Sequence, residues 1–479
     1  MVQAKVVLYE LNEVPWSVLD YYTATRPQSN LAAVVKDGRC LTTLNEDVEE
    51  LSPWRTWPTI HNSLYTREHN SFELGQDPST FKGQPVWDVA VENGLRVGVF
   101  GALQSWPPRT MPAGFFIPDT FAKTPETFPS HVAKFQRFNL HMTADNAFSS
   151  DGAVSSKEVL GVATYLLAHG LRPSSAAGLV RHLLREACDA RWKAARPVMQ
   201  AQPSFDLFWR LHKSRNPHLS IYFTNHVASM MHRFWGDAIQ GYGDHFDYDV
   251  DEVYSKFLLL ALDIADGQLG RLLKQARNKP ERVVVIAASM GQDAISPEGG
   301  AGTQRMLHLA HPELLAIGMG FPGAVGRLAM HPKCSIEFLE DGHAAEAAGI
   351  LHSATIEGFG RVFEGIEVHG RSLVFSTSYR GFPESQSGPE LSMVVKGRQK
   401  CSELSAAGVQ VRGRLGGSNT AYHIPEGILL VYGSRVAAGG NREQIGALDV
   451  APSILQHLGV PVPTSMHGAT DERMFAARH

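Results

Sequence analysis

Five short runs rich in β-branched and aliphatic residues recur along this 479-residue chain, and helix-like segments lie between them. The runs cover residues 6–11, 96–100, 218–223, 282–287 and 428–432. Strands that alternate with helices at this spacing predict βαβ units and a mainly parallel sheet. The sequence therefore favours an α/β fold in which helices flank one central sheet.

Two segments depart from this alternation. Residues 125–217 are mostly helical in pattern and rich in Ala, Leu and Arg, which predicts a helical insertion that is a candidate cap over a crevice at the strand ends. Residues 335–410 contain stretches of period two, which predict a smaller β-rich elaboration. No internal repeat is present, so we expect residues 1–479 to form a single α/β domain that carries both additions.

Composition limits the partners of the chain. Its net charge of −4 gives no basic bias, which argues against a nucleic acid polymer as partner. The longest apolar run, residues 159–171, is interrupted and too short to span a bilayer, so no membrane partner is expected. The four cysteines are scattered and the first residues resemble a strand, not a signal peptide, which predicts a cytoplasmic location. The sequence is compatible with an oligomer and does not fix the oligomeric state.

Residues 51–62 place the hydroxyl of Thr56 between two tryptophans and two prolines. The prolines stiffen this stretch, which predicts a loop followed by a helix that starts at Thr59 or Asn62. Thr56 would then lie just ahead of a helix N-terminus, where an anion is favoured and a hydroxyl can attack phosphorus or sulfur. The alternative is a rigid aromatic turn with a buried hydroxyl.

Histidines are densest in residues 224–235, where His226 follows a predicted strand and His232 lies six residues later. Imidazole is a common ligand of zinc and similar metals. A spacing of six does not put two side chains on one helix face, so a turn must intervene if both are to bind one ion. His423, in a polar loop before an apolar strand, is the third candidate. The alternative is that these histidines cap backbone groups or lie in the core.

Polar residues also end the predicted strands, namely Asn12, His226 and Ser289. The carboxyl ends of parallel strands meet at one edge of a sheet, and site residues gather there. We therefore expect one crevice to bring these three positions together.

The order of these segments resembles the alkaline phosphatase superfamily, and most closely its nucleotide pyrophosphatase/type I phosphodiesterase branch. The most specific match is the stretch 448–463, which resembles the signature V-D-I-A-P-T-I-L-x-L-L-G-x-x-x-P. The likeness covers residues 4–124, 218–294 and 415–465. It implies an alkaline-phosphatase-like α/β fold with a mainly parallel sheet.

The resemblance also implies a chemistry. In that superfamily two metal ions, usually zinc, flank a Thr or Ser nucleophile that takes up the phosphoryl group. Thr56 falls at the nucleophile position, and Arg55 beside it would stabilise the equatorial oxygens. His232 falls near the histidine of the D-x-x-G-H motif, and His423 matches the histidine of G-T-H.

Several motifs depart from the superfamily pattern. Asn12 and Glu13 replace the Asp-Gly that ends the first strand, and Ser289 and Met290 replace the Asp and His of S-D-H-G-M. The metal site next to the nucleophile thereby loses its usual ligands, because serine and methionine are poor zinc ligands. The carboxylates that could substitute are Glu10, Glu13 and Asp293.

The other metal site keeps His232 and His423, and His226 would replace its missing aspartate. We therefore expect one divalent ion, zinc, rather than two, with Thr56, Arg55 and Asn12 as catalytic residues. The predicted function is a hydrolase or transferase that acts on a small phosphate-type or sulfate-type ester, with a nucleotide-like or sugar-like group. The alternative is an inactive member of the fold that serves as a ligand-binding or scaffolding module.

Overall fold

The structure is a computed structural model, and no helix among its described residues is both long and apolar enough to cross a membrane. The described residues are 3–47, 51–74, 76–146, 156–297, 305–309, 312–321, 323–328, 333–378, 392–395, 402–403, 406–413 and 419–478.

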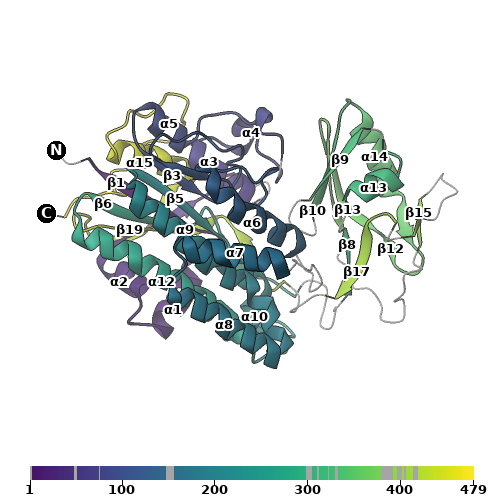
Figure 1. Cartoon of the computed structure of the whole chain (residues 1–479), viewed down its shortest axis with the longest axis horizontal. Helices are drawn as coiled ribbons and strands as arrows, with labels where there is room; N and C mark the ends of the chain where they lie inside the picture. The colour runs from purple at the N-terminus through teal and green to yellow at the C-terminus, as the bar shows by residue number, and fades with distance from the viewer. Residues whose placement is uncertain are drawn as a thin grey trace.

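A sheet of eight strands forms the centre of the larger part of the molecule (Figure 1). Neighbouring strands pair in parallel, except that β19 runs antiparallel to both of its neighbours. The predicted α/β fold with a mainly parallel sheet is confirmed. In spatial order the strands are β20 (Gly439–Gly446), β2 (Arg39–Leu44), β19 (Glu426–Tyr432), β6 (Arg282–Ala287), β1 (Lys5–Leu11), β5 (Leu219–Thr224), β3 (Val97–Phe100) and β4 (Phe115–Ile117).

The central strands are buried on both faces, which explains their almost continuous apolar sequences. In β1, Val7, Tyr9 and Leu11 belong to one hydrophobic cluster, whereas Val6 and Leu8 belong to another. This alternation follows the two-residue period of a strand. The helices of the first cluster include α9 (Arg196–Arg215), α10 (His226–Ala238) and α12 (Phe257–Asn278), and those of the second include α3 (Pro53–Asn62), α5 (Val86–Glu92) and α15 (Val450–His457).

The helical character predicted for residues 125–217 is confirmed, although residues 147–155 lie outside the described part of the chain. The last helix, α9, packs against α12 and against β3 and β5, so it belongs to the helical layer on one face of the sheet. The other helices of this segment are α6 (Ala133–Asn146), α7 (Ser156–Ala168) and α8 (Pro173–Cys188).

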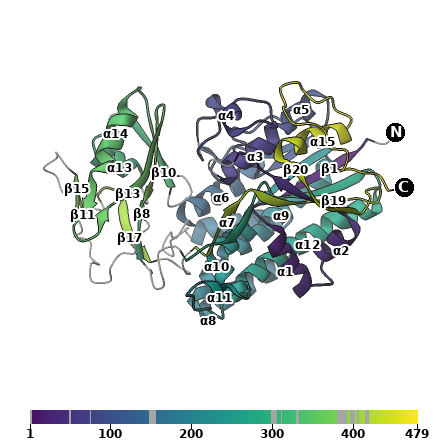
Figure 2. The ribbon, with the colours of Figure 1, turned by 180° about the vertical axis from the view of Figure 1, so that it is seen from behind.

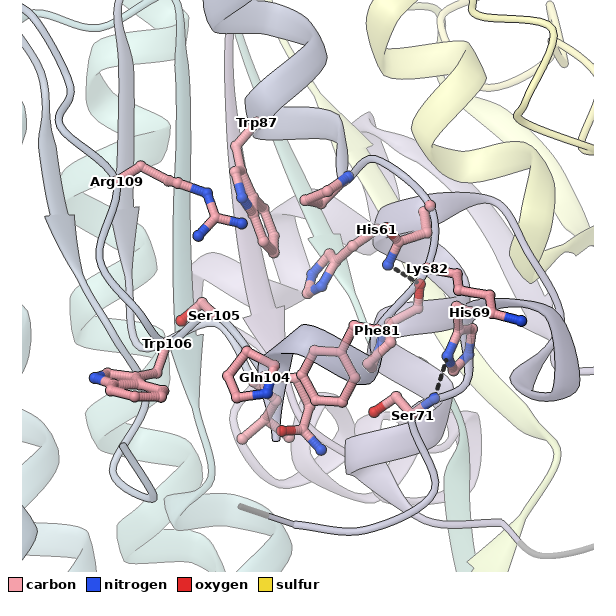
Figure 3. A pocket seen from close by; sticks show the side chains of 16 residues that line it. His61, His69, Ser71, Phe81, Lys82, Trp87, Gln104, Ser105, Trp106 and Arg109 are labelled. Carbon is pink, nitrogen blue, oxygen red and sulfur yellow. Dashed lines mark hydrogen bonds between the residues drawn. The ribbon is translucent and has the colours of Figure 1, made fainter. Parts of the chain in front are cut away.

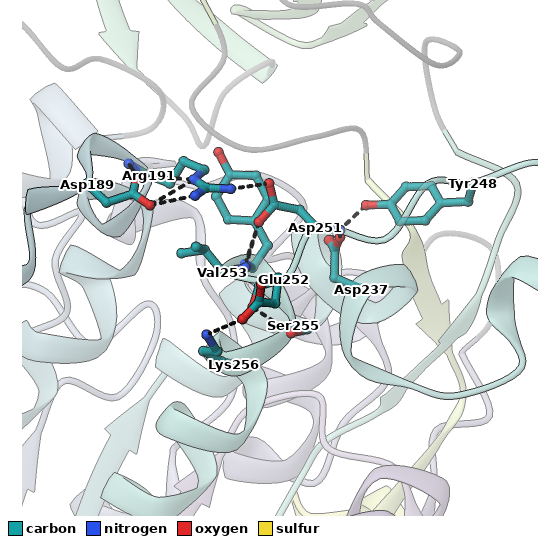
Figure 4. A network of polar contacts seen from close by, with 10 residues as sticks. Asp189, Arg191, Asp237, Tyr248, Asp251, Glu252, Val253, Ser255 and Lys256 are labelled. Atoms are coloured by element: carbon teal, nitrogen blue, oxygen red, sulfur yellow. Dashed lines mark hydrogen bonds and ion pairs between the residues drawn. The ribbon is translucent and has the colours of Figure 1, made fainter.

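A polar network joins this helical segment to the residues ahead of α12 (Figure 4). The guanidinium of Arg191 donates to Asp189 and, at 2.9 Å, to Asp251. Asp251 in turn donates its backbone N–H to Asp237, near the end of α10. Helix α12 begins after this network, at Phe257.

A β-rich part lies beside the sheet-bearing part, as both ribbon views show (Figure 1 and Figure 2). The β-rich character predicted for residues 335–410 is confirmed, and the strands already begin at β8 (Arg305–Leu309) and extend to β17 (Val409–Gly413). Residues 379–391, 396–401 and 404–405 of the predicted range lie outside the described residues. Its main sheet has the antiparallel order β13 (Phe363–His369), β14 (Ser372–Thr377), β10 (Lys333–Phe338) and β9 (Ala324–Leu328), and it has its own hydrophobic cluster.

Candidate metal site

The chain leaves β1 through Asn12 and Glu13, and Glu13 adopts a left-handed backbone conformation with φ of 61°. A residue with a Cβ atom adopts this conformation at a cost, which is why glycine is favoured there. Glu13 is nevertheless buried, with 1% of its surface exposed. Strained residues of this kind concentrate at functional sites.

The carboxylate of Glu13 meets two histidines from distant segments. Its Oε2 atom lies 2.9 Å from Nε2 of His232 and 3.4 Å from Nε2 of His423. His232 comes from the middle of α10. His423 comes from β18 (Ala421–Ile424), which pairs with β7 (Gly291–Ala294) beyond the end of β6.

Backbone carbonyls fix the orientation of both imidazole rings. Nδ1 of His232 lies 3.0 Å from the carbonyl oxygen of Ala421, and Nδ1 of His423 lies 2.7 Å from that of Leu51. A carbonyl only accepts, so each Nδ1 carries a hydrogen, and in the neutral form of each ring the lone pair of Nε2 faces Glu13. Two lone pairs facing a carboxylate oxygen repel it unless a cation lies among them.

These three side chains fit a divalent metal ion. Their ligand atoms all lie within 4.8 Å of one another. Ligands at about 2.0–2.1 Å from a tetrahedral zinc ion are separated by about 3.3 Å, close to the two distances above. A histidine whose other nitrogen donates to a carbonyl is also the usual arrangement of a metal ligand. Without a metal, two protons on the rings would have to balance the site.

Amide side chains hold Glu13 in place. Asn12 donates from Nδ2 to Oε1 of Glu13 at 2.7 Å, and Gln292 donates to Oε2. The indole N–H of Trp57 donates to Oδ1 of Asn12 at 2.8 Å. Burial alone would raise the pKa of Glu13, but without a metal ion the charges and hydrogen bonds of protonated His423 and His232 hold this pKa well below its ordinary value. Glu13 is thus an ionised, oriented carboxylate.

The structure does not bring His226 to this group. Its Nδ1 is 2.6 Å from the hydroxyl of Thr224, and its Nε2 is 3.0 Å from the carbonyl oxygen of Ala261. Helix α10 is continuous from His226 past His232, with no break between them. A separation of six residues therefore places the two side chains on different sides of the helix. Burial lowers the pKa of His226 to about 4, so its ring is neutral.

Two of the candidate carboxylates also lie elsewhere. Glu10 accepts a hydrogen bond from His61 at 2.6 Å, on the α3 side of β1. Asp293 is exposed on β7, and its carboxylate accepts from the backbone N–H of Ala294. Of the carboxylates proposed from the sequence, Glu13 is the one that lies with His232 and His423.

Thr56 lies inside a helix and not in a loop. The prediction that the helix starts at Thr59 or Asn62 is wrong, because α3 begins at Pro53, in the first turn where proline is tolerated. Pro58 lies inside the helix and has no N–H for the carbonyl of Trp54. The hydroxyl of Ser71 donates to that carbonyl at 3.0 Å instead. This contact lets the helix continue through Pro58.

The side chain of Thr56 meets the end of β6. Its Oγ1 lies 2.7 Å from Oγ of Ser289, and the two residues are 1% and 0% exposed. An ion bound to both oxygens at about 2.0–2.2 Å would separate them by more than this distance. The hydroxyl pair therefore fills the position at which the sequence motif lacks its Asp and His.

Arg55 faces away from this pair. Its Nε donates to the carbonyl of Phe72 at 2.9 Å, and one terminal nitrogen lies 3.4 Å from Glu73. Glu73 also belongs to a second group of candidate ligands, with Glu367 and His369 of the β-rich part. Glu367 and His369 are exposed and Arg55 already balances Glu73, so the group around Glu13 fits an ion better.

Sequence reasoning missed two residues that hold Glu13, namely Gln292 and Trp57. Gln292 lies opposite His423 in the β7–β18 ladder, which is why its amide reaches Oε2. The only signal for Gln292 was its place in the altered S-D-H-G-M motif. The indole of Trp57 projects from α3 toward the end of β1, a contact that follows only from the helical conformation of residues 53–62.

No protein-family model and no curated protein sequence matches this chain. Solved structures do match it. The murine ectonucleotide pyrophosphatase/phosphodiesterase 5, in complex with AMP, is 10% identical with a TM-score of 0.42, and the match covers 98% of each chain. The phosphonoacetate hydrolase of Sinorhizobium meliloti, in complex with phosphonoformate, is 11% identical with a TM-score of 0.41, over 96% of each chain.

The wild-type alkaline phosphatase PafA is 12% identical with a TM-score of 0.45, over 99% of this chain and 100% of its own. At these identities and scores, the chemistry of the site rests on the residues of this chain.

Proposed function

We propose that this protein is a metal-dependent hydrolase of phosphate-type esters that binds one divalent ion through Glu13, His232 and His423. The observation that carries the proposal is the orientation of the two imidazole rings. Each donates from Nδ1 to a backbone carbonyl and turns Nε2 toward the same oxygen of Glu13. Such a set of two histidines and one carboxylate suits zinc and leaves a fourth position for a small ligand.

The proposal specifies one ion, not two. The second position of a two-metal site would lie next to Thr56, where the resemblance places an aspartate and a histidine. Ser289 and Met290 stand there instead, and the hydroxyl of Ser289 is hydrogen-bonded to that of Thr56. Hydroxyl and thioether groups are weak ligands for zinc, which supports a single site.

In this proposal each residue of the site has a separate role. A divalent ion at this site supplies Lewis-acid polarisation of a phosphoryl oxygen or of water. Thr56 is the proposed nucleophile, and its hydrogen bond to Ser289 aligns the hydroxyl. Asn12 positions Glu13, and Arg55 would bind equatorial oxygens if its guanidinium turned from Glu73 toward the substrate.

The proposed substrate is a small ester of phosphate or sulfate with a nucleotide-like or sugar-like group. The ester type rests on the sequence resemblance to phosphodiesterases and pyrophosphatases. The nucleotide-like or sugar-like group rests on the tryptophans in and beside the site segments, which could stack on a planar group, namely Trp54, Trp57, Trp106 and Trp235. A cytoplasmic location is part of the same proposal, because four scattered cysteines suit a reducing compartment.

A second candidate function is ligand binding without turnover. The observation that favours it is the burial of Thr56, which is 1% exposed and cannot meet a substrate without a movement of α3 or of the residues around it. In that case the fold and the metal site would serve recognition or scaffolding, as the sequence alternative states.

One experiment separates the two functions. Purified protein is analysed for bound metal, and is then assayed against generic phosphomonoester, phosphodiester and sulfate ester substrates. We expect about one zinc ion per chain and hydrolysis of a phosphate ester. His232→Ala, His423→Ala and Glu13→Gln should each lose both, whereas His245→Ala, a change at an exposed histidine of another segment, should keep both.

Metal binding without any turnover would support the ligand-binding function. If neither metal nor turnover is found and Thr56→Ala behaves as the wild type, both the metal site and the enzymatic proposal fall.

A further inference from the structure

A cavity of about 120 Å³ lies beside the C-terminal half of α3. Its walls come from α3, α5 and the loops around residues 69–85 and 103–109. Figure 3 shows that His61, Trp87, Phe81 and Gln104 surround it. None of Glu13, His232, His423, Thr56 or Ser289 lines the cavity, so it is separate from the candidate metal site.

The charge of the cavity walls is positive. Lys82 and Arg109 contribute to the lining, and no aspartate or glutamate does so among the residues that the structure describes. Arg109 is held by Asp88 at 3.3 Å. Lys82 is exposed and has no ion-pair partner within the described ranges. An anion that enters the cavity therefore meets two cations. Arg109 is already paired with Asp88, whereas Lys82 has no carboxylate partner among the described residues.

Three polar atoms of the lining residues have no hydrogen-bond partner among the residues that the structure describes. They are Nδ1 of His61, Nε1 of Trp87 and Oγ of Ser105. The three residues are only 1%, 3% and 4% exposed. Buried polar atoms are nearly always hydrogen-bonded, and leaving one unpaired costs about 1–3 kcal/mol. Three such atoms on residues that line one cavity indicate a site for a polar ligand, which these atoms would reach through small adjustments of their side chains.

The hydrogen-bonding state of His61 determines whether a ligand group that faces its Nδ1 must donate or accept. Its Nε2 lies 2.6 Å from the buried carboxylate of Glu10, which accepts, so Nε2 carries a hydrogen. In the neutral ring Nδ1 is then an acceptor. Trp87 offers a donor, and Ser105 can donate or accept. A ligand that is complementary to this neutral form of His61 therefore carries both a hydroxyl and oxygens that accept.

We propose that this cavity binds a small protonated oxyanion, of which hydrogen phosphate is the best match. The ligand hydroxyl donates to Nδ1 of His61, its oxygens accept from Trp87 and Ser105, and Lys82 and Arg109 balance its charge. The volume equals that of about four water molecules at ~30 Å³ each, which suits orthophosphate with its five non-hydrogen atoms.

Sulfate provides the critical comparison. It has the size and shape of phosphate but carries no hydroxyl at neutral pH, so it leaves Nδ1 of His61 facing an acceptor. A hydrogen bond to a charged group contributes about 1.5–3 kcal/mol, so we expect phosphate to bind at least about tenfold more tightly than sulfate. Glycolate, which has both a hydroxyl and a carboxylate, should also bind, and acetate, which lacks the hydroxyl, should bind more weakly.

The test is isothermal titration calorimetry of the metal-depleted full-length chain with inorganic phosphate, sulfate, glycolate and acetate. Ser105→Ala removes one atom that has no partner among the described residues, so the fold should remain about as stable as in the wild type. Trp87→Phe removes another such atom but also part of a buried ring, so thermal unfolding checks that this variant is folded. Each of the two variants should weaken phosphate binding about tenfold or more. Lys82→Gln should weaken it too, whereas the matched controls Lys213→Gln and Ser255→Ala should not.

His232→Ala locates the binding site. If the cavity is the site, phosphate binding survives this change, because His232 is not part of the lining. Binding that is lost in His232→Ala but kept in Ser105→Ala and Trp87→Phe would place phosphate at the Glu13 cluster and overturn the proposal. An absence of phosphate binding, or equal binding of phosphate and sulfate, would overturn it as well. None of these outcomes depends on whether the chain hydrolyses an ester.

Discussion

The side-chain oxygens of Thr56 and Ser289 lie 2.7 Å apart in a buried contact between α3 and the end of β6. This contact joins the proposed nucleophile to the residue that stands where the superfamily motif has a metal-binding aspartate. It gives the hydroxyl of Thr56 a fixed direction. The consequences for stability and for turnover can be measured separately.

Thr56→Val removes the hydroxyl with little change of shape. We expect it to leave Ser289 unpaired and to lower the free energy of unfolding by about 1–3 kcal/mol. If Thr56 is the nucleophile, turnover of the phosphate ester should fall by at least about 10³-fold, the scale seen when a nucleophile is removed. Thr56→Ser should retain both. Urea unfolding and steady-state kinetics measure the two effects.

Ser289→Ala is the matched control for this pair. It breaks the same hydrogen bond from the other side, so it should cost a similar free energy of unfolding, but the nucleophile remains. Turnover should fall by about tenfold or less. Equal losses of turnover in Thr56→Val and Ser289→Ala would show that the hydrogen bond matters and the nucleophile assignment is mistaken.

Bound metal should stabilise the folded chain through Glu13. A ligand that binds only the folded state adds about 2.7 kcal/mol at a concentration of 100 Kd. Zinc should therefore raise the melting temperature of the wild type, and a chelator should reverse the shift. In Glu13→Gln the zinc-dependent shift should disappear. A shift that persists in Glu13→Gln would place the ion elsewhere, for instance at Glu73, Glu367 and His369.

The backbone of Glu13 gives a prediction that does not depend on metal. Glu13→Gly and Glu13→Ala both remove the carboxylate and its hydrogen bonds, but only glycine adopts φ of 61° without strain. The left-handed conformation costs other residues about 1–2 kcal/mol, and the greater freedom of glycine in the unfolded chain offsets part of this gain. We expect Glu13→Gly to be about 1 kcal/mol more stable than Glu13→Ala in urea unfolding. Equal stability would show that position 13 is unstrained.

The sheet was predictable because its strands are buried on both faces. That burial requires apolar runs such as those of β1 and β6, and these runs are visible in the sequence. Helix α3 was not predictable in the same way. A proline at position 58 usually ends a helix, and the group that compensates for it, the hydroxyl of Ser71, comes from a loop whose position depends on the tertiary fold.

The candidate site was partly predictable. His232, His423 and Glu13 were all among the proposed ligands, and the structure brings them together from three separate segments. His226 was expected to join them only if a turn separated it from His232, and α10 has no such turn.

The placement of Glu10 follows from strand alternation. It shares its parity with Val6 and Leu8, which face the α3 side of the sheet, so its carboxylate is directed toward His61. Glu13 lies beyond the end of the strand, where alternation no longer applies. The direction of its side chain depends on the left-handed backbone conformation at position 13. No local sequence pattern indicated this conformation, because the glycine that usually indicates it is absent.

Buried neutral histidines should make the protein lose stability in mild acid. Burial lowers the pKa of His226 to about 4, from an ordinary value of 6.5, and that of His69 and His212 to about 4 as well. Below pH 6.5 the unfolded chain takes up protons that the folded chain cannot, so the stability contributed by each histidine is complete above this pH and declines as the pH falls toward 4. At pH 5 each one costs about 2 kcal/mol.

Two buried aspartates act in the opposite direction over part of this range. Burial raises the pKa of Asp119 and of Asp237 to about 6, so the folded chain holds their protons below pH 6 while the unfolded chain releases them. The contribution of a single histidine is therefore best measured by comparing variants. Between pH 7 and pH 5, His226→Gln should lose less free energy of unfolding than the wild type by about 2 kcal/mol, whatever its stability at pH 7. His245→Gln, at an exposed position, should keep the pH dependence of the wild type. If His226→Gln also keeps it, His226 is protonated in the folded state and cannot be a neutral core residue.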